Sequence, residues 1–246
     1  MSDGAKGRAA TRTAIVDAAA DLLREGGPAA VTTRGVAERA GVQAPAIYRL
    51  FGDKDGLLEA VAEHVMAAFV ADKAAGMAAA TAAEVDPLDD LRASWHRQID
   101  FSLANPAVFR LLSDPERVLG SPAARMGRQL LETRVHRLAA AGRLRVSEPR
   151  AVDLIQAAGI GTIQILLASP PERRDPALAD AMMEAVLSRI LTDATADAPA
   201  GAADGPLAAA VALRASAPRL GALSDSERRL LVEWLDRVTE DGAAPR

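Results

Sequence analysis

The stretch AGVQAPAIYRLFGDKDGLL, residues 40–58, combines an early glycine, a proline four residues later and the only tyrosine of the chain. Proline suits the first position of a helix, because the N–H that it lacks has no helical partner there. A helix that begins at Pro45 places Ile47, Leu50 and Phe51 on one face, at spacings i, i+3 and i+4. Pro45 and Arg49 point the opposite way. The spacing therefore predicts a short helix that docks by one face and offers the other outward.

Two further helices are predicted before this stretch. In RTAIVDAAADLLREGG, apolar residues recur at helical spacing from Ile15 to Leu23, and Gly26 and Gly27 end the pattern. The segment TTRGVAERA fits a second, shorter helix capped by Thr32 or Thr33, and Gly41 ends it. A longer helix is expected to begin at Lys54.

A short helix, a glycine-bearing turn and a second short helix match the helix-turn-helix arrangement, whose second helix lies in the major groove of DNA. Small side chains at Ala44, Pro45 and Ala46 let the backbone approach base edges closely. Tyr48 is able to reach a phosphate with its hydroxyl, and Lys54 adds a charge at a helix start. The alternatives are a packing tyrosine and an exposed lysine.

Arg34, just inside the second helix, is the residue here best able to make a bidentate contact with guanine. Two other readings stay open for it, a phosphate contact and a solvated surface arginine.

Residues 12–70 resemble the DNA-binding region of the TetR family of bacterial transcriptional regulators. The resemblance rests on TTRGVAERAGVQAPAIYRLFGDKDGLLEAV, about a quarter of the chain with its flanks. It implies an all-helical homodimer, each subunit of which gives one recognition helix to half of a palindromic operator of double-stranded DNA. It also implies phosphate contacts for the residues matching Thr33, Tyr48 and Lys54, and base contacts for Arg34 and residues 43–46.

The predicted DNA-binding set comprises Thr32, Thr33, Arg34, Gln43, Ala44, Pro45, Ala46, Tyr48, Arg49 and Lys54. Alanines occupy positions 44 and 46, where many relatives carry polar side chains. The prediction therefore moves base recognition toward Arg34, Gln43, methyl contacts and DNA shape.

Composition excludes several other classes of site. The chain has 246 residues, no cysteine and three well-separated histidines, so thiolate chemistry is excluded and no metal site or other cofactor is expected. The net charge is -4, so DNA binding must depend on local placement of charge. No apolar run approaches the roughly 18 to 20 residues of a membrane span, and no leader is evident, so the expected location is cytoplasmic.

The rest of the chain also reads as helices, which makes the predicted fold class all-α. The coarse spans are 87–104, 106–113, 122–141, 149–168 and 175–192, with breaks at NP, DPERVLGSP, AAGRLRVSEP and SPPERRDP. The predicted organisation is a basic flexible arm at 1–11, a DNA-binding domain at 12–70, an effector-binding and dimerisation domain at 71–194, a linker at 195–206 and an extension at 207–246.

The extension is expected to pack on the second domain. Ser224 and Glu227 form the pattern of a capping box, S-x-x-E. An apolar stripe then follows at Leu230, Leu231, Trp234, Leu235 and Val238.

For the second domain, the resemblance implies a pocket for a small-molecule effector of unknown identity and a four-helix dimer interface built from 149–168 and 175–192. Gly159 and Gly161 would allow close helix approach there, and residues 178, 182, 186 and 190 repeat at helical spacing, although core packing produces the same pattern. The candidate cavity residues are Trp95, Phe101, Phe109 and Met126, with Gln98, Gln156 or His136 as polar anchors; each such residue is more often plain core.

The leading functional hypothesis is a dimeric repressor whose operator affinity falls when an effector binds, with the helix from Lys54 to about Lys73 as the lever. A ligand-independent regulator or an activator would share the same DNA-binding half. A helical enzyme is the remote alternative: Asp89, Asp90, Asp114, Glu116 and His96 supply acids and a base without a defined pairing.

Overall fold

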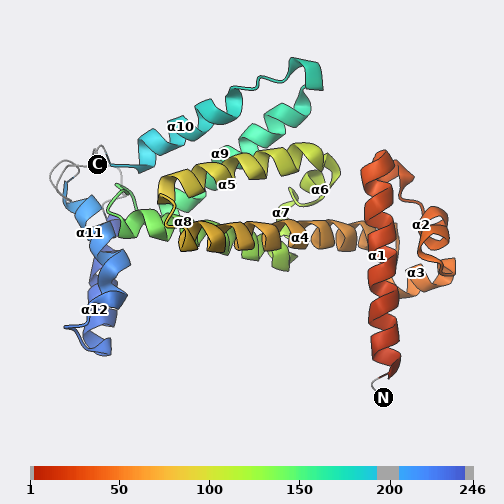
Figure 1. Ribbon diagram of the computed structural model, residues 1–246, viewed down its shortest axis with the longest axis horizontal. Coiled ribbons are helices and arrows are strands. Elements are labelled where there is room, and N and C mark those ends of the chain that lie inside the picture. Colours follow the sequence, from red (N-terminus) through yellow and green to blue (C-terminus); the bar gives the residue numbers. More distant parts are fainter. Residues whose placement is uncertain (1–2, 193–204, 242–246) are drawn as a thin grey trace. The chain divides into compact units, whose positions relative to one another are not determined.

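The computed structural model describes residues 3–192 and 205–241, and in these ranges the chain is all-α, as predicted. The helices are α1 Asp3–Ala30, α2 Thr33–Ala40, α3 Ala44–Phe51, α4 Lys54–Ala82, α5 Pro87–Ala104, α6 Pro106–Leu111, α7 Pro115–Gly120, α8 Pro122–Ala140, α9 Glu148–Ala168, α10 Leu178–Ile190, α11 Gly205–Ser216 and α12 Asp225–Asp241 (Figure 1). Two 3-10 turns, Pro171–Arg173 and Ala217–Arg219, complete the set, and β pairing in the described ranges amounts to one isolated bridge between Leu144 and Leu191.

The chain forms two compact units that are not continuous in sequence. The first contains residues 1–76 and 101–127, and the second contains residues 77–100 and 128–246. The predicted boundaries at 70 and 71 treat the domains as continuous segments. Packing instead adds α6, α7 and the start of α8 to the first unit, because Val108 is buried in its core.

Local signals in the first unit end and begin helices where the sequence predicts. Gly27 has φ 68° and ψ -170°, which breaks the path of α1 before Pro28. Thr32 caps α2, since its Oγ1 accepts a hydrogen bond from the Gly35 N–H at 3.1 Å. Gly41 ends α2 with φ 65°, a left-handed conformation that glycine adopts without strain.

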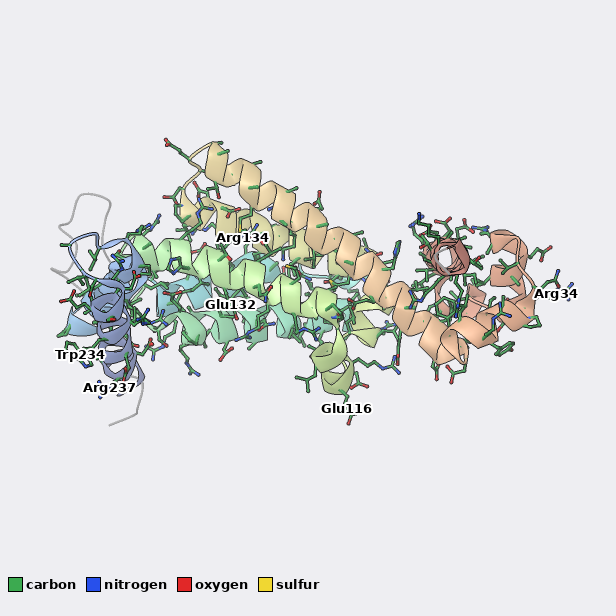
Figure 2. All side chains as sticks on the ribbon, turned by 90° about the horizontal axis from the view of Figure 1, so that it is seen from below. Arg34, Glu116, Glu132, Arg134, Trp234 and Arg237 are labelled. Atoms are coloured by element: carbon green, nitrogen blue, oxygen red, sulfur yellow. The ribbon has the colours of Figure 1, made fainter. Side chains whose placement is uncertain are left out.

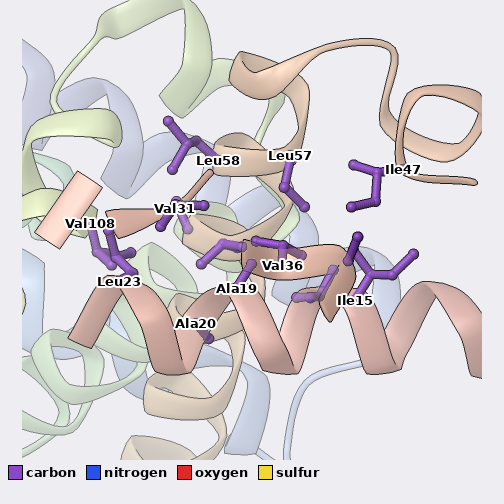
Figure 3. Packing of buried hydrophobic residues seen from close by; sticks show 14 residues of the cluster. Ile15, Ala19, Ala20, Leu23, Val31, Val36, Ile47, Leu57, Leu58 and Val108 are labelled. Carbon is purple, nitrogen blue, oxygen red and sulfur yellow. The ribbon is translucent and has the colours of Figure 1, made fainter. Parts of the chain in front are cut away.

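One apolar core holds these helices together (Figure 3). Ile15 and Ala19 of α1, Val36 of α2, Ile47 of α3 and Val61 of α4 are all less than 3% exposed. Removal of this much apolar surface from water is the main favourable contribution to folding of the unit. Phe69 and Phe101 add a stacked pair with centroids 3.8 Å apart.

Two predicted segments differ from the structure. Residues 3–11, expected as a flexible arm, are helical and continue directly into α1, because nothing between residues 3 and 26 interrupts the helical path. The segment DPERVLGSP, expected as a break, contains the one-and-a-half-turn helix α7. Asp114 caps this helix by accepting a hydrogen bond from the Glu116 N–H at 3.0 Å, and its proline stands in the first turn, where proline is tolerated.

The second unit is built on α5, α8, α9 and α10. Trp95 of α5 is 5% exposed and donates its indole N–H to the Ala179 carbonyl at 3.1 Å. Its ring lies against Gly159, where an added Cβ would come within 3.4 Å of Trp95 Cζ3. Gly159 therefore serves packing inside the chain, whereas Gly161 has no neighbour within 4 Å of an added Cβ.

The C-terminal helices α11 and α12 lie side by side (Figure 1). The predicted capping box is present: Ser224 N–H donates to Glu227 Oε2 at 2.8 Å, and Glu227 N–H donates to Ser224 Oγ at 3.4 Å. The hairpin attaches to the start of α9 by an ion pair between Arg214 and Glu148 at 3.3 Å. Most of the predicted linker falls outside the described residues, and Gly205 and Pro206 begin α11.

The apolar stripe of α12 docks only in part, which corrects the prediction. Leu231 and Leu235 are half-buried, whereas Leu230, Trp234 and Val238 are 42%, 52% and 50% exposed. The stripe is wider than the surface that α11 and its neighbours offer, so one edge of it stays in solvent.

Two helices are long and apolar enough, by length and composition alone, to cross a bilayer. They are α4, with a mean hydropathy of 1.3, and α9, with 1.6. The expectation that no segment approaches this length was therefore too strict. Two such helices are weak evidence for a span, because apolar core helices pass the same test, and seven residues of α9 are buried within the protein.

Candidate nucleic-acid interface

The helix α3 is held by its apolar face and by both of its ends. Ile47 is 2% exposed, and Leu50 and Phe51 pack against the same core, as predicted. Gln43 is the N-cap, so Pro45 stands at the second helical position and not at the first. At the other end Gly52 has φ 81°, a conformation that disfavours any residue with a Cβ.

The junction between α3 and α4 depends on a close backbone approach. Asp53 caps α4 by accepting a hydrogen bond from the Gly56 N–H at 2.8 Å. A Cβ on Gly56 would lie 2.2 Å from the Phe51 carbonyl oxygen. A backbone atom cannot be displaced cheaply, so glycine is required at position 56. Sequence reasoning missed this residue because the constraint is a contact between segments and not a local turn.

The predicted DNA-binding residues lie on neighbouring elements of the first unit: α2 with its cap, α3 with its cap and the start of α4. Tyr48 is 55% exposed, and Thr32, Arg34, Gln43, Pro45, Arg49 and Lys54 are also exposed. Thr33, Ala44 and Ala46 are half-buried, and Ala44 packs against the apolar core. Figure 2 shows the side chain of Arg34 pointing away from the surrounding helices. All ten residues belong to the first unit, within the segment from the α2 cap to the first residue of α4.

Cationic side chains at this face have no partners within the described ranges. Arg34, Arg49 and Lys54 make no hydrogen bond or ion pair there. Arg39, by contrast, is held by Glu25 through bonds of 2.7 and 3.0 Å, and the hydrogen bond from Arg39 lowers the pKa of Glu25. Exposed cations without protein partners are the groups that neutralise phosphates.

Arg12 makes a contact with α3 that the sequence did not predict. In the structure its guanidinium carbon lies 5.1 Å from the centroid of the Phe51 ring, on the inner side of α3. Arg12 therefore supports the helix through a cation–π contact. Lys6 and Arg8 are exposed.

Glu63 of α4 binds the first turn of α8, a contact that sequence reasoning missed. Its carboxylate accepts hydrogen bonds from Ser121 Oγ at 2.5 Å and from the Ala123 N–H at 2.7 Å. Ser121 in turn accepts a bond from the Ala124 N–H at 2.9 Å. A carboxylate suits this place, because the first N–H groups of a helix lack helical partners and carry partial positive charge. The sequence shows the Ser-Pro pair at the start of α8, but it does not show that the partner of Ser121 lies 58 residues away.

Two of the four residues proposed for an effector cavity make other contacts: Trp95 is bonded to Ala179, and Phe101 stacks on Phe69. A third, Met126, is 51% exposed. Among the polar anchors, Gln156 accepts a bond from Arg128 at 2.5 Å and His136 lies 3.3 Å from Glu148. The set was chosen by residue type, which does not reveal the direction of each side chain.

A cavity of about 640 Å³ lies in the first unit, and its lining differs from the predicted aromatic set. Charged and small residues of α1, α4, α6 and α7 surround it, including Arg12, Glu59, Glu63 and Arg117. In the described ranges, no group of three or more His, Asp or Glu side chains is placed to hold a metal ion.

Comparison with known proteins identifies the N-terminal helices. Residues 15–61 match the family described as bacterial regulatory proteins, tetR family. The chain is 51% identical over 53 residues to the tetracycline repressor protein class A from transposon 1721 of Escherichia coli, which covers 22% of this chain and 24% of that protein. It is 44% identical over 59 residues to an HTH-type transcriptional repressor of Mycobacterium tuberculosis, covering 24% of this chain and 31% of that one.

Solved structures extend the similarity of fold beyond these helices. RolR in complex with resorcinol aligns with a TM-score of 0.60 at 19% identity, over 76% of this chain and 90% of that one. A TetR-family regulator from Mesorhizobium loti aligns with a TM-score of 0.57 at 18% identity, over 75% and 98%. At these identities the similarity shows the fold alone, and the curated relatives are matched over less than a third of their length.

Proposed function

We propose, from the premise that the chain belongs to the tetR family of bacterial regulatory proteins, that it is a cytoplasmic DNA-binding regulator and not an enzyme. The observation that carries the proposal is the outward face of α3, where Tyr48 is 55% exposed and Arg34, Arg49 and Lys54 lack protein partners in the described ranges. The helix is fixed from behind by Ile47 and ends at the glycine turn of Gly52, so the face is held in place.

We assign different roles to the residues of this face. Tyr48, Lys54 and Thr33 contact phosphates and set the position of the helix in the major groove. Arg34, exposed and directed outward, contacts guanine, while Gln43 and the methyl groups of Ala44 and Ala46 meet other base edges. Thr32 contributes mainly through its cap on α2, because its hydroxyl accepts the Gly35 N–H.

The functional unit proposed is a homodimer on a palindromic operator. Outward small or apolar residues on α9 and α10 support this assembly: Ile160 and Ile165 are 46% and 61% exposed, and Ala177, Ala181 and Ala185 are also exposed. The repeat at Leu178, Met182, Val186 and Ile190 faces inward instead, since Val186 and Ile190 are buried in the chain. Two recognition helices related by a two-fold axis would read half-sites about 34 Å apart or a multiple of this.

We further propose that the second domain, from about residue 71, binds a small-molecule effector that lowers operator affinity. RolR, which shares the fold, was solved with the ligand resorcinol. An effector acts only through different affinities for the DNA-competent and incompetent arrangements. Helix α4 carries this difference, because it begins with Lys54 at the DNA-binding face and binds α8 through Glu63.

The test is binding to a fluorescent duplex taken from the DNA upstream of the chain's own gene, against a scrambled duplex. We expect the wild type to prefer the upstream duplex and Tyr48→Ala with Lys54→Ala to lose this binding. Arg150→Ala, an exposed cation in the first turn of α9, is the charge-matched control and should bind as the wild type does. Equal binding of both duplexes by the wild type, or unchanged binding by the double variant, would contradict the proposal.

A further inference from the structure

Helix α5 turns polar side chains toward the interior of the second unit. Asp90 and Ser94 are 3% and 5% exposed, and Arg97 and Gln98 are half-buried about one turn beyond Ser94 on the same face. Polar groups in the interior lower stability unless each finds a partner. The inner face of α5 therefore carries polar groups that need partners, in addition to its apolar packing residues.

Positive charge exceeds negative charge at this face. Asp90 Oδ2 accepts a bond from Arg137 Nη1 at 2.9 Å and lies 3.2 Å from Arg134 Nε, and the side chain of Arg134 is 0% exposed. Burial lowers the pKa of Arg134, the Asp90 carboxylate opposes this, and Arg97 and Arg137 add to it by repulsion. Two guanidinium groups thus contact one carboxylate, and Arg97 lies near enough to Arg134 to repel it.

Arg97 has two donor atoms that remain unused. Its Nε and Nη2 atoms are shielded from solvent and have no hydrogen-bond acceptor in the described ranges. An unsatisfied buried donor lowers stability, and it does so more when it is charged. A guanidinium does not lose its proton at physiological pH, so deprotonation cannot remove this cost. An incoming anion would remove it.

We propose that Arg97, with Arg134 and Arg137 beside it, binds the oxyanion group of an effector, and that this effector is an organic acid with an apolar body. The guanidinium fork matches the geometry of a carboxylate or phosphate. Leu138, buried one turn beyond Arg134 on the same face of α8, supplies apolar surface for the rest of the molecule. The inference rests on the proposed function, because it names the chemical class of its effector.

Binding at Arg97 requires a change in packing. The two nitrogens are shielded from solvent, so α5 and α8 must separate slightly to admit the anion. The acid binds more tightly to the separated arrangement, in which it pairs with Arg97, than to the closed one. This difference in affinity shifts the equilibrium between the two arrangements.

The experiment uses three anionic probes, octanoate, benzoate and inorganic phosphate, with octanamide as the uncharged match to octanoate. Thermal unfolding of the full chain is followed by circular dichroism at probe concentrations up to the millimolar range. We expect an organic acid to raise Tm in a saturable way while octanamide does not. In Arg97→Leu and Arg97→Gln the half-saturating concentration of that acid should rise at least tenfold. Arg92→Leu is the matched control, because Arg92 lies five residues earlier on α5 and forms a surface pair with Glu184 at 2.8 Å.

Several outcomes would overturn the inference. These are no saturable shift with any anion, a shift with octanamide equal to that with octanoate, or unchanged half-saturation in both folded Arg97 variants. A shift with phosphate alone would likewise contradict an organic acid.

Operator binding is measured on the same samples. If the chain binds no operator yet responds to the acid through Arg97, the regulator proposal fails and the anion site stands. If it binds the operator but meets one of the contradicting outcomes, only the inference about the effector fails.

Discussion

Replacement of Glu63 by alanine removes the side-chain cap that α4 places on α8. The carboxylate accepts bonds of 2.5 Å from Ser121 Oγ and 2.7 Å from the Ala123 N–H, and Ser121 is 5% exposed. Hydrogen bonds to a charged group contribute roughly 1.5–3 kcal/mol each, and loss of a helix cap costs about 1 kcal/mol. Since Glu63 is half-buried and water replaces part of what is lost, we expect Glu63→Ala to lower the free energy of unfolding by about 2–4 kcal/mol.

The assay is urea unfolding followed by circular dichroism at 222 nm, with hydrogen exchange at the amides of Ala123 and Ala124 as a local measurement. Glu59→Ala is the matched control, because Glu59 is an exposed carboxylate one turn earlier on α4 whose ion pair with Arg117 is 3.4 Å long. Exposed pairs of this kind contribute about 0–1 kcal/mol. Hydrogen exchange at the Ala123 amide should be faster in Glu63→Ala than in the wild type, and it should be unchanged in Glu59→Ala.

The reasoning would be refuted if Glu63→Ala unfolded at the same urea concentration as Glu59→Ala and exchange at Ala123 were unchanged. Glu63→Gln keeps an acceptor oxygen but loses the charge, and it should fall between the wild type and Glu63→Ala.

Four further predictions concern other residues of the chain. Gly56→Ala should destabilise the first unit and abolish operator binding, because a Cβ would meet the Phe51 carbonyl oxygen at 2.2 Å, whereas Gly7→Ala, which has no neighbour within 4 Å, should melt as the wild type does. Arg34→Ala should weaken operator binding by about 1–3 kcal/mol, roughly 5- to 150-fold, and should relax the sequence preference at one base pair. Lys54→Ala should weaken binding to all duplexes alike and should reduce the slope of log affinity against log salt concentration by about one. Identical binding profiles for the two variants would contradict their separate roles. Burial raises the pKa of Asp86, but bonds from the Leu88 N–H and Arg143 outweigh this effect and lower the pKa below 3.8. The stabilisation by the Asp86 carboxylate is therefore present above this pH and is lost as the pH falls through the pKa of the folded state. The difference in stability between the wild type and Asp86→Asn should be seen at pH 6 and should shrink at pH 3. Ile160→Glu together with Ile165→Glu should convert the proposed dimer to a monomer in light scattering without loss of helicity, and a wild type that is monomeric at micromolar concentration would count against the dimer.

Much of the proposed DNA-binding face was predictable because its signals are local. The positions of Thr32, Gly41 and Ile47 follow from capping, from the left-handed turn and from helical spacing, each of which acts within a few residues. The start of α4 at Lys54 and the bounds of α5 at 87 and 104 agree with the sequence for the same reason. The helix α7 was missed because its proline was taken as a break, although proline also begins helices.

By itself the sequence determined the all-α class, the outward face of α3 and the ends of most helices, because these depend on propensity and spacing along the chain. The tertiary structure alone decided the rest. Contacts between different helices include the close approach at Gly56, the support of Phe51 by Arg12, the binding of Glu63 to α8 and the pairing of Asp90 with Arg134 and Arg137. Such contacts depend on which faces of the helices pack against each other, and the spacing of residues along one helix does not indicate the face that it will contact.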